Sequence, residues 1–96
     1  MTEGKPVSKV LVLDDSPVHV EAIKRFCDDH NLIGLKVRRN RLLNVLRSNI
    51  DLGAILLAED YGGSVEESAI VATQIDALRP ELPIILRRGS TRFSPA

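Results

Sequence analysis

The feature that most constrains the fold is an alternation of short apolar runs with longer amphipathic segments. Four short runs are continuous and rich in Val, Ile and Leu: Lys9–Leu13, Leu32–Val37, Gly53–Ala58 and Leu82–Leu86. Runs of this kind are typical of strands that are buried on both faces of a sheet. The three segments between them repeat their apolar residues at helical spacing. The resulting order, β-α-β-α-β-α-β, predicts a parallel sheet with right-handed crossovers and helices on its faces.

Capping residues predict where the helices begin and end. Ser16 with Pro17 in the first turn begins the first helix, which ends at residues 28–31. Asn40 is expected to cap a short helix over Arg41–Ser48. Ser64 and Glu67 form a capping-box pattern for a third helix, which Pro80 ends. The predicted inward positions on the first and third helices are Val20, Ile23, Phe26, Cys27, Ile70, Val71, Ile75 and Leu78.

Composition limits the size of the protein and its partners. A chain of 96 residues suits one small domain, and three aromatic residues leave a core that should be aliphatic. Thirteen basic and thirteen acidic residues give a net charge of zero, so nothing global attracts the chain to nucleic acid or to an anionic membrane. The single cysteine, Cys27, excludes an internal disulfide, and no apolar run is long enough to span a bilayer. We therefore expect a cytoplasmic protein.

Charged residues follow every predicted strand. In an open parallel sheet, ligands bind beyond the carboxyl ends of the strands. Asp14-Asp15 and Glu59-Asp60 form two acidic groups there, and Arg38-Arg39 and Arg87-Arg88 form two basic ones. Adjacent carboxylates are suited either to a hard cation such as Mg²⁺ or to a helix cap that meets water. His19 and His30 have no Glu or Cys partner at ligand spacing, so both are expected at the surface.

Three segments resemble the receiver domain of bacterial two-component response regulators. They are VLVLDDSP with the helix after it, IDLGAILLAEDYGG and ELPIILRRG. The resemblance covers about Lys9 to Gly89 and implies a flavodoxin-like sheet of order 2-1-3-4 that lacks the family's last strand and last two helices. Residues 1–8 are then a flexible lead-in, 9–89 a truncated receiver-like domain, and 90–96 a tail or the start of a missing segment, with residues 87–96 expected to be irregular.

The same resemblance assigns site residues and leaves gaps among them. Asp14 and Asp15 match the acidic pair that holds Mg²⁺ in the family. The phosphoryl-accepting aspartate falls on Ala58, on Glu59 if the register slips by one, or on Asp60 if the strand runs two residues further. The switch Thr or Ser falls on Arg88, and the family's lysine lies on a strand that this chain does not supply. Arg88 is either a permanent cation that neutralises Asp14, Asp15 and Glu59, or a solvated arginine.

These gaps predict a receiver-like regulatory domain that is not phosphorylated, performs no catalysis and needs no cofactor. It would act through protein partners in bacterial signalling and form a homodimer, with the fourth strand or residues 90–96 at the interface. Two alternatives stay open. One is a working receiver that uses Mg²⁺ and Asp60, and the other is a sensor of a small anion held by Arg88 and its neighbours.

Overall fold

The computed structural model describes residues 8–48, 51–88 and 92–95. Its strands form one sheet of order β2-β1-β3-β4-β5. The elements in chain order are β1 (Ser8–Leu13), α1 (Pro17–Asp29), β2 (Leu32–Lys36), the 3-10 turn η1 (Arg39–Arg41), α2 (Leu42–Ser48), β3 (Leu52–Ala58), α3 (Val65–Leu78), β4 (Ile84–Arg88) and β5 (Arg92–Pro95). The predicted parallel order 2-1-3-4 is confirmed.

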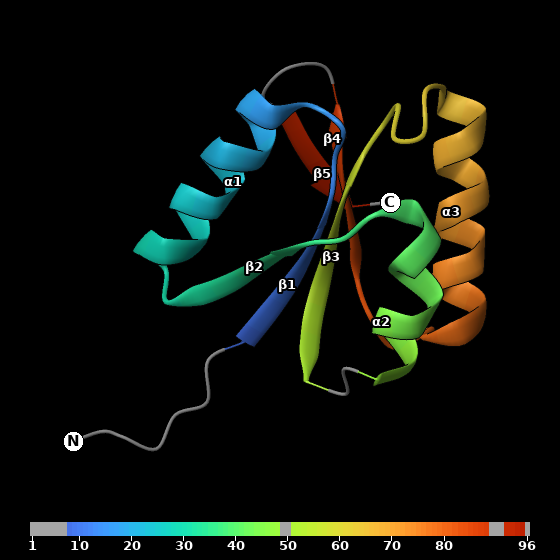
Figure 1. Cartoon of the computed structure of the whole chain (residues 1–96), viewed down its shortest axis with the longest axis horizontal. Coiled ribbons are helices and arrows are strands. Elements are labelled where there is room, and N and C mark those ends of the chain that lie inside the picture. The colour runs from blue at the N-terminus through green and yellow to red at the C-terminus, as the bar shows by residue number, and fades with distance from the viewer. Residues whose placement is uncertain (1–7, 49–50, 89–91, 96) are drawn as a thin grey trace.

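Helices cover both faces of the sheet (Figure 1). α1 lies on one side, while α2 and α3 lie together on the other. The larger apolar core fills the α2/α3 side and includes Leu11, Leu57 and Val71. A smaller core lies under α1 and includes Val12, Ile23 and Cys27. None of the described helices has both the length and the apolar character needed to cross a bilayer.

A fifth strand, which the sequence did not predict, pairs with β4. Residues 92–95 form β5 and pair with β4 in antiparallel fashion, with Leu86 opposite Ser94 and Arg88 opposite Arg92. The expected irregular tail is therefore wrong for these residues, and β4 is not the edge of the sheet. A hairpin strand is held by backbone hydrogen bonds, so a polar sequence forms one without the apolar run that strand prediction depends on.

Two of the three predicted helix-capping residues are confirmed, and Asn40 is not. Ser16 Oγ accepts a hydrogen bond from the backbone N–H of His19, and Ser64 Oγ accepts one from that of Glu67. Asn40 is not a cap, because Arg38 precedes the turn η1 and α2 begins only at Leu42.

Two predicted inward residues face solvent instead. Ile70 is 47% exposed and Phe26 is 53% exposed. The Phe26 ring stacks on His30, with centroids 4.1 Å apart. Helices on an open sheet bury a narrow stripe, so residues at the margin of the apolar arc remain in water.

Candidate functional site

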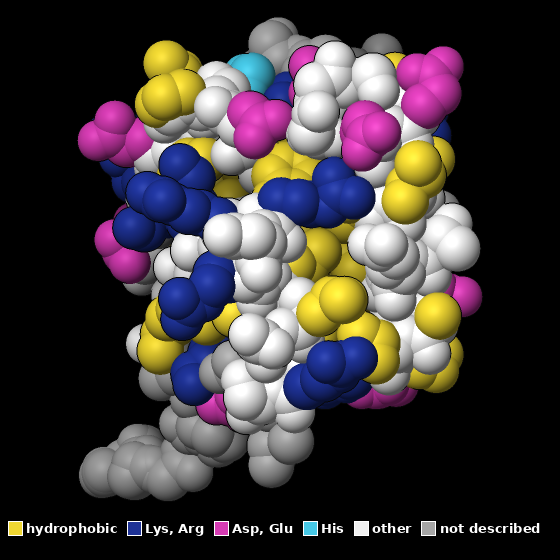
Figure 2. Space-filling view, turned by 45° about the vertical axis from the view of Figure 1, so that its right-hand side comes forward, with side chains coloured by type: hydrophobic (Ala, Val, Ile, Leu, Met, Phe, Trp, Pro, Cys, Tyr) yellow, Lys and Arg dark blue, Asp and Glu magenta, His cyan; other side chains and the backbone are white. Residues whose placement is uncertain are grey.

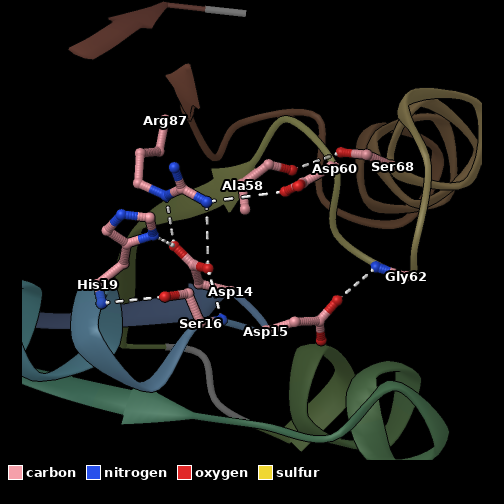
Figure 3. Close-up of polar contacts among 9 residues, drawn as sticks. All are labelled: Asp14, Asp15, Ser16, His19, Ala58, Asp60, Gly62, Ser68 and Arg87. Atoms are coloured by element: carbon pink, nitrogen blue, oxygen red, sulfur yellow. Dashed lines mark hydrogen bonds and ion pairs between the residues drawn. The ribbon is translucent and has the colours of Figure 1, made fainter. Parts of the chain in front are cut away.

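Three strands end at the same edge of the sheet and place three side chains together. Asp14 directly follows β1, Ala58 is the last residue of β3, and Arg87 lies on β4 opposite Ala58 in the register. The close-up shows Arg87 extending over Ala58 to Asp14 (Figure 3). This edge is where the sequence analysis expected a site, and Asp14 is there as predicted.

A buried ion pair between Arg87 and Asp14 lies at the centre of this edge. Arg87 Nε donates to Asp14 Oδ2 over 2.5 Å, and Nη2 donates to Oδ1 over 3.2 Å. The backbone N–H of Ser16 donates to the same Oδ1 over 3.0 Å. Asp14 is 3% exposed and Arg87 is 5% exposed. The two-point geometry and the extra donor compensate the desolvation that a buried carboxylate suffers.

The cation of the site is Arg87. Of the two interpretations of Arg88, a permanent cation in the pocket or a solvated arginine, the structure shows the second. Arg88 is exposed. It faces the other side of the sheet from Arg87, because successive residues of a strand point to opposite sides. Arg87 lies in register with Ala58 and shares its side of the sheet, which directs it toward Asp14. Hydropathy does not distinguish two neighbouring arginines, so only the register of β3 against β4 could have identified Arg87.

Asp15 holds the loop between β3 and α3 and is not part of the ion pair. Its Oδ2 accepts a hydrogen bond of 2.9 Å from the backbone N–H of Gly62 (Figure 3). Gly62 has φ of 89°, a left-handed conformation that glycine adopts without strain. The two adjacent carboxylates therefore have different roles. Asp14 binds Arg87, and Asp15 fixes the loop between β3 and α3.

The other two predicted acidic residues take different positions. Asp60 is in the turn after β3, and its Oδ1 lies 3.7 Å from Arg87 Nη2 on a side chain that is 71% exposed. Glu59 is partly buried, and its backbone N–H donates to the carbonyl of Arg87. An open pocket of about 370 Å³ is lined by Asp14, Asp15, Ser16, His19, Asp60, Gly63 and Arg87. The structure thus brings Asp14, Asp15 and Asp60 to one pocket but not Glu59.

His19 is a further residue of the pocket that the sequence analysis missed. It was expected at the surface, but its side chain is only 24% exposed and Nδ1 lies 3.9 Å from Asp14 Oδ2. His19 lies in the first turn of α1, three residues after the Ser16 cap, and this position places its side chain next to the Asp14 carboxylate. A histidine three residues after a capped helix start was the signal available in the sequence.

The donors at this edge do not fit a divalent metal ion. Both oxygens of Asp14 already accept hydrogen bonds from Arg87, and one oxygen of Asp15 is bound to Gly62. Among the residues that the structure describes, no group of three His, Cys, Asp or Glu side chains is placed to hold a metal. The guanidinium group lies where a cation would balance the Asp14 charge.

Tyr61, in the loop after β3, is an aromatic member of the core, which we expected to be aliphatic. It is 4% exposed, and its hydroxyl donates to the backbone carbonyl of Val37 over 3.3 Å. Burial raises the pKa of Tyr61, the negative charge of Asp15 raises it further, and Arg39 opposes both. The phenol therefore links the end of β2 to the β3–α3 loop in its neutral form.

Replacing Tyr61 by phenylalanine should lower the free energy of unfolding by about 0.5–1.5 kcal/mol at neutral pH, since one intramolecular hydrogen bond is lost. Because the pKa of Tyr61 is raised in the folded state, the wild type should also lose stability as the pH rises past the ordinary value of 10.0. Tyr61 is the only tyrosine in the chain, so Tyr61→Phe should lose less stability over that range. Urea denaturation at neutral and alkaline pH measures both effects, and an identical alkaline loss in both proteins would contradict the assignment.

Comparison with known proteins gives one informative likeness. No protein-family model matches the chain, and no curated protein matches it significantly. Among solved structures, the chain is similar to a response regulator from Thermotoga maritima, with a TM-score of 0.73 and 17% sequence identity. The superposition covers 86% of this chain and 67% of the other. The likeness shows that this chain has the fold of a response-regulator receiver domain.

Proposed function

We propose that this chain is a receiver-like regulatory domain that accepts no phosphoryl group and acts in bacterial signalling through contacts with other proteins in the cytoplasm. The observation that carries the proposal is the buried pair between Arg87 and Asp14, opposite Ala58. A methyl side chain at the end of β3 offers no nucleophile. The arginine already neutralises the carboxylate that would otherwise attract a metal ion.

The experiment is an amide NMR titration of the wild type with Mg²⁺ and then with beryllofluoride, a mimic of the phosphoryl group. We expect neither addition to shift the resonances of Asp14, Asp15 and Asp60, because Asp14 is already paired. The buffer and fluoride alone, added to a parallel sample, control for changes in ionic strength. Saturable shifts at these three residues that need both Mg²⁺ and beryllofluoride would contradict the proposal.

The working-receiver alternative rests on Asp60. Its carboxylate lines the same pocket and lies 3.7 Å from Arg87 Nη2. If beryllofluoride does bind, Asp60→Asn separates the two cases: loss of the shifts in this variant would identify Asp60 as the acceptor. Inorganic phosphate added alone tests the remaining alternative, and saturable shifts with phosphate would favour an anion sensor.

We also propose that the chain forms a homodimer through the α1 side of β3 and β4. In the described part of the chain α1 is the one helix on that side, and it packs on β1 and β2. Leu56 packs against the smaller core under α1, and its register partner Ile85 on β4 is also partly buried. Apolar surface therefore continues from that core onto β4. Covering this surface with a second copy would remove it from water.

Light scattering at tens of micromolar should therefore give the mass of two chains. Ile85→Glu places a charge in the middle of the proposed interface, and this variant should be monomeric while it keeps its far-UV circular dichroism. Ile70→Glu makes the same change at an exposed position on α3, on the other side of the sheet, and should stay dimeric. A monomeric wild type would refute self-association and leave the phosphorylation proposal untouched.

A further inference from the structure

We propose that the surface formed by η1 and α2 binds an acidic segment of a partner protein. This inference deepens the proposed function by naming the chemistry of the partner. From Leu32 to Ser48 the chain carries five basic residues and no Asp or Glu. The other eight basic residues are outnumbered by all thirteen acidic ones, so the rest of the chain has a net charge of −5. Charge in this neutral protein is therefore separated along the sequence.

Four of these residues form what we call the basic face: Arg38, Arg39, Arg41 and Arg47. All four are exposed. Figure 2 shows Lys and Arg side chains over the middle and lower part of the side that carries α2 and α3, while several Asp and Glu side chains lie along its upper part and others at its edges. Arginine side chains concentrated on one surface raise the local positive potential and attract anionic groups.

Among the described residues, little of this charge is paired with an acidic side chain. Arg39 forms an exposed ion pair with Glu67, Nη1 to Oε1 over 3.3 Å. For Arg38, Arg41 and Arg47, the described part of the chain contains no ion pair. Arg87 differs from these three arginines, because it is buried and forms an ion pair with Asp14. Arginines that have no structural role at the surface remain available for carboxylates, which they bind through two parallel hydrogen bonds.

Apolar side chains lie among the arginines. Leu43 is 38% exposed and Ile33 is 41% exposed. Leu43 and Arg47 are four residues apart on α2, so they share one side of the helix. Ile33 is two residues before Leu35 on β2, so the two side chains lie on the same side of the sheet. Leu35 packs on the α2/α3 core, and Ile33 therefore faces the α2 side. A ligand for this surface would combine carboxylates with apolar residues, which is the chemistry of an acidic amphipathic peptide.

The neighbouring charges favour a peptide over a nucleic acid. Asp15, Asp60 and Glu66 are exposed, and Figure 2 shows Asp and Glu side chains along the upper part of the face that carries the Lys and Arg side chains. A nucleic acid carries its phosphates in an extended regular row and would be driven against these acidic side chains. Within the basic face there is also no aromatic side chain on which a base could stack. A short acidic segment can occupy the arginines without reaching the acidic side chains.

The test is fluorescence anisotropy with a short labelled peptide of alternating glutamate and leucine, added to the full chain at low and at physiological ionic strength. We expect saturable binding that weakens with salt. Arg38→Glu/Arg41→Glu should lose at least about tenfold in affinity, since two charge contacts become repulsive. Leu43→Ser should weaken binding without changing its salt dependence.

The matched control is Lys24→Glu/Arg25→Glu, which changes the net charge by the same amount on exposed residues of α1. It should bind the peptide as the wild type does. Equal losses in the two double variants would show that net charge alone drives binding and would overturn the inference. No binding by the wild type, or tighter binding of single-stranded DNA of matched length, would also overturn it. None of these outcomes depends on the response to beryllofluoride, so the two proposals fail separately.

Discussion

Arg87→Met should lower the free energy of unfolding by about 3–5 kcal/mol, the cost of breaking a buried ion pair from one side. The substitution keeps most of the buried volume and removes the charge, so Asp14 is left 97% buried without its cationic partner. The loss is a large fraction of the 5–15 kcal/mol that is typical of a domain. Urea denaturation followed by circular dichroism measures it.

The neighbouring Arg88→Met is the matched control. Arg88 is exposed and differs from Arg87 only in the side of the strand it faces, so this change should cost no more than ~0.5 kcal/mol. The double variant Asp14→Leu/Arg87→Met should be more stable than Arg87→Met alone, because the unpaired charge is removed as well. Similar losses in the Arg87 and Arg88 variants would show that the pair contributes nothing specific.

Arg87→Ser should convert a pocket that does not respond to Mg²⁺ into one that does. The change removes both arginine hydrogen bonds from Asp14, which keeps only the one from the backbone N–H of Ser16. It also removes one positive charge from a pocket that contains Asp15 and Asp60. One unit charge at roughly 4 Å is worth about 4 kcal/mol at an effective dielectric constant near 20, which corresponds to about a thousandfold in affinity. Amide NMR titration with Mg²⁺ of the wild type and the variant gives the ratio.

Two controls make this result specific. Arg88→Ser removes the same charge at an exposed residue on the opposite side of β4 and should leave Mg²⁺ binding as weak as in the wild type. Asp14→Asn in the Arg87→Ser background should abolish the gained binding. If the Arg87→Ser protein is folded and still does not bind Mg²⁺, then Arg87 is not the group that prevents Mg²⁺ from binding at Asp14.

Much of the fold was readable from local pattern. The apolar runs identified β1 to β4, and the serines at 16 and 64 identified two helix starts, because a capping hydroxyl acts on the N–H three residues on. The parallel order and the placing of Asp14 at the site followed from strand ends meeting at one edge. Two sequence predictions were wrong for different reasons. Phe26 and Ile70 are apolar but exposed at the margin of their helices. Strand β5 is polar in sequence and forms by pairing with β4.

The sequence by itself determined that the chain alternates strands with helices, that two acidic residues follow the first strand, and that Ala58 ends the third. Only the tertiary structure decided which arginine meets Asp14, where β4 finds its outer partner, and which acidic residues share the pocket. The physical reason is the same in each case. Register fixes the side of the sheet that each residue faces and the partner it pairs with, and register is a property of two strands together. No pattern within one strand distinguishes Arg87 from Arg88.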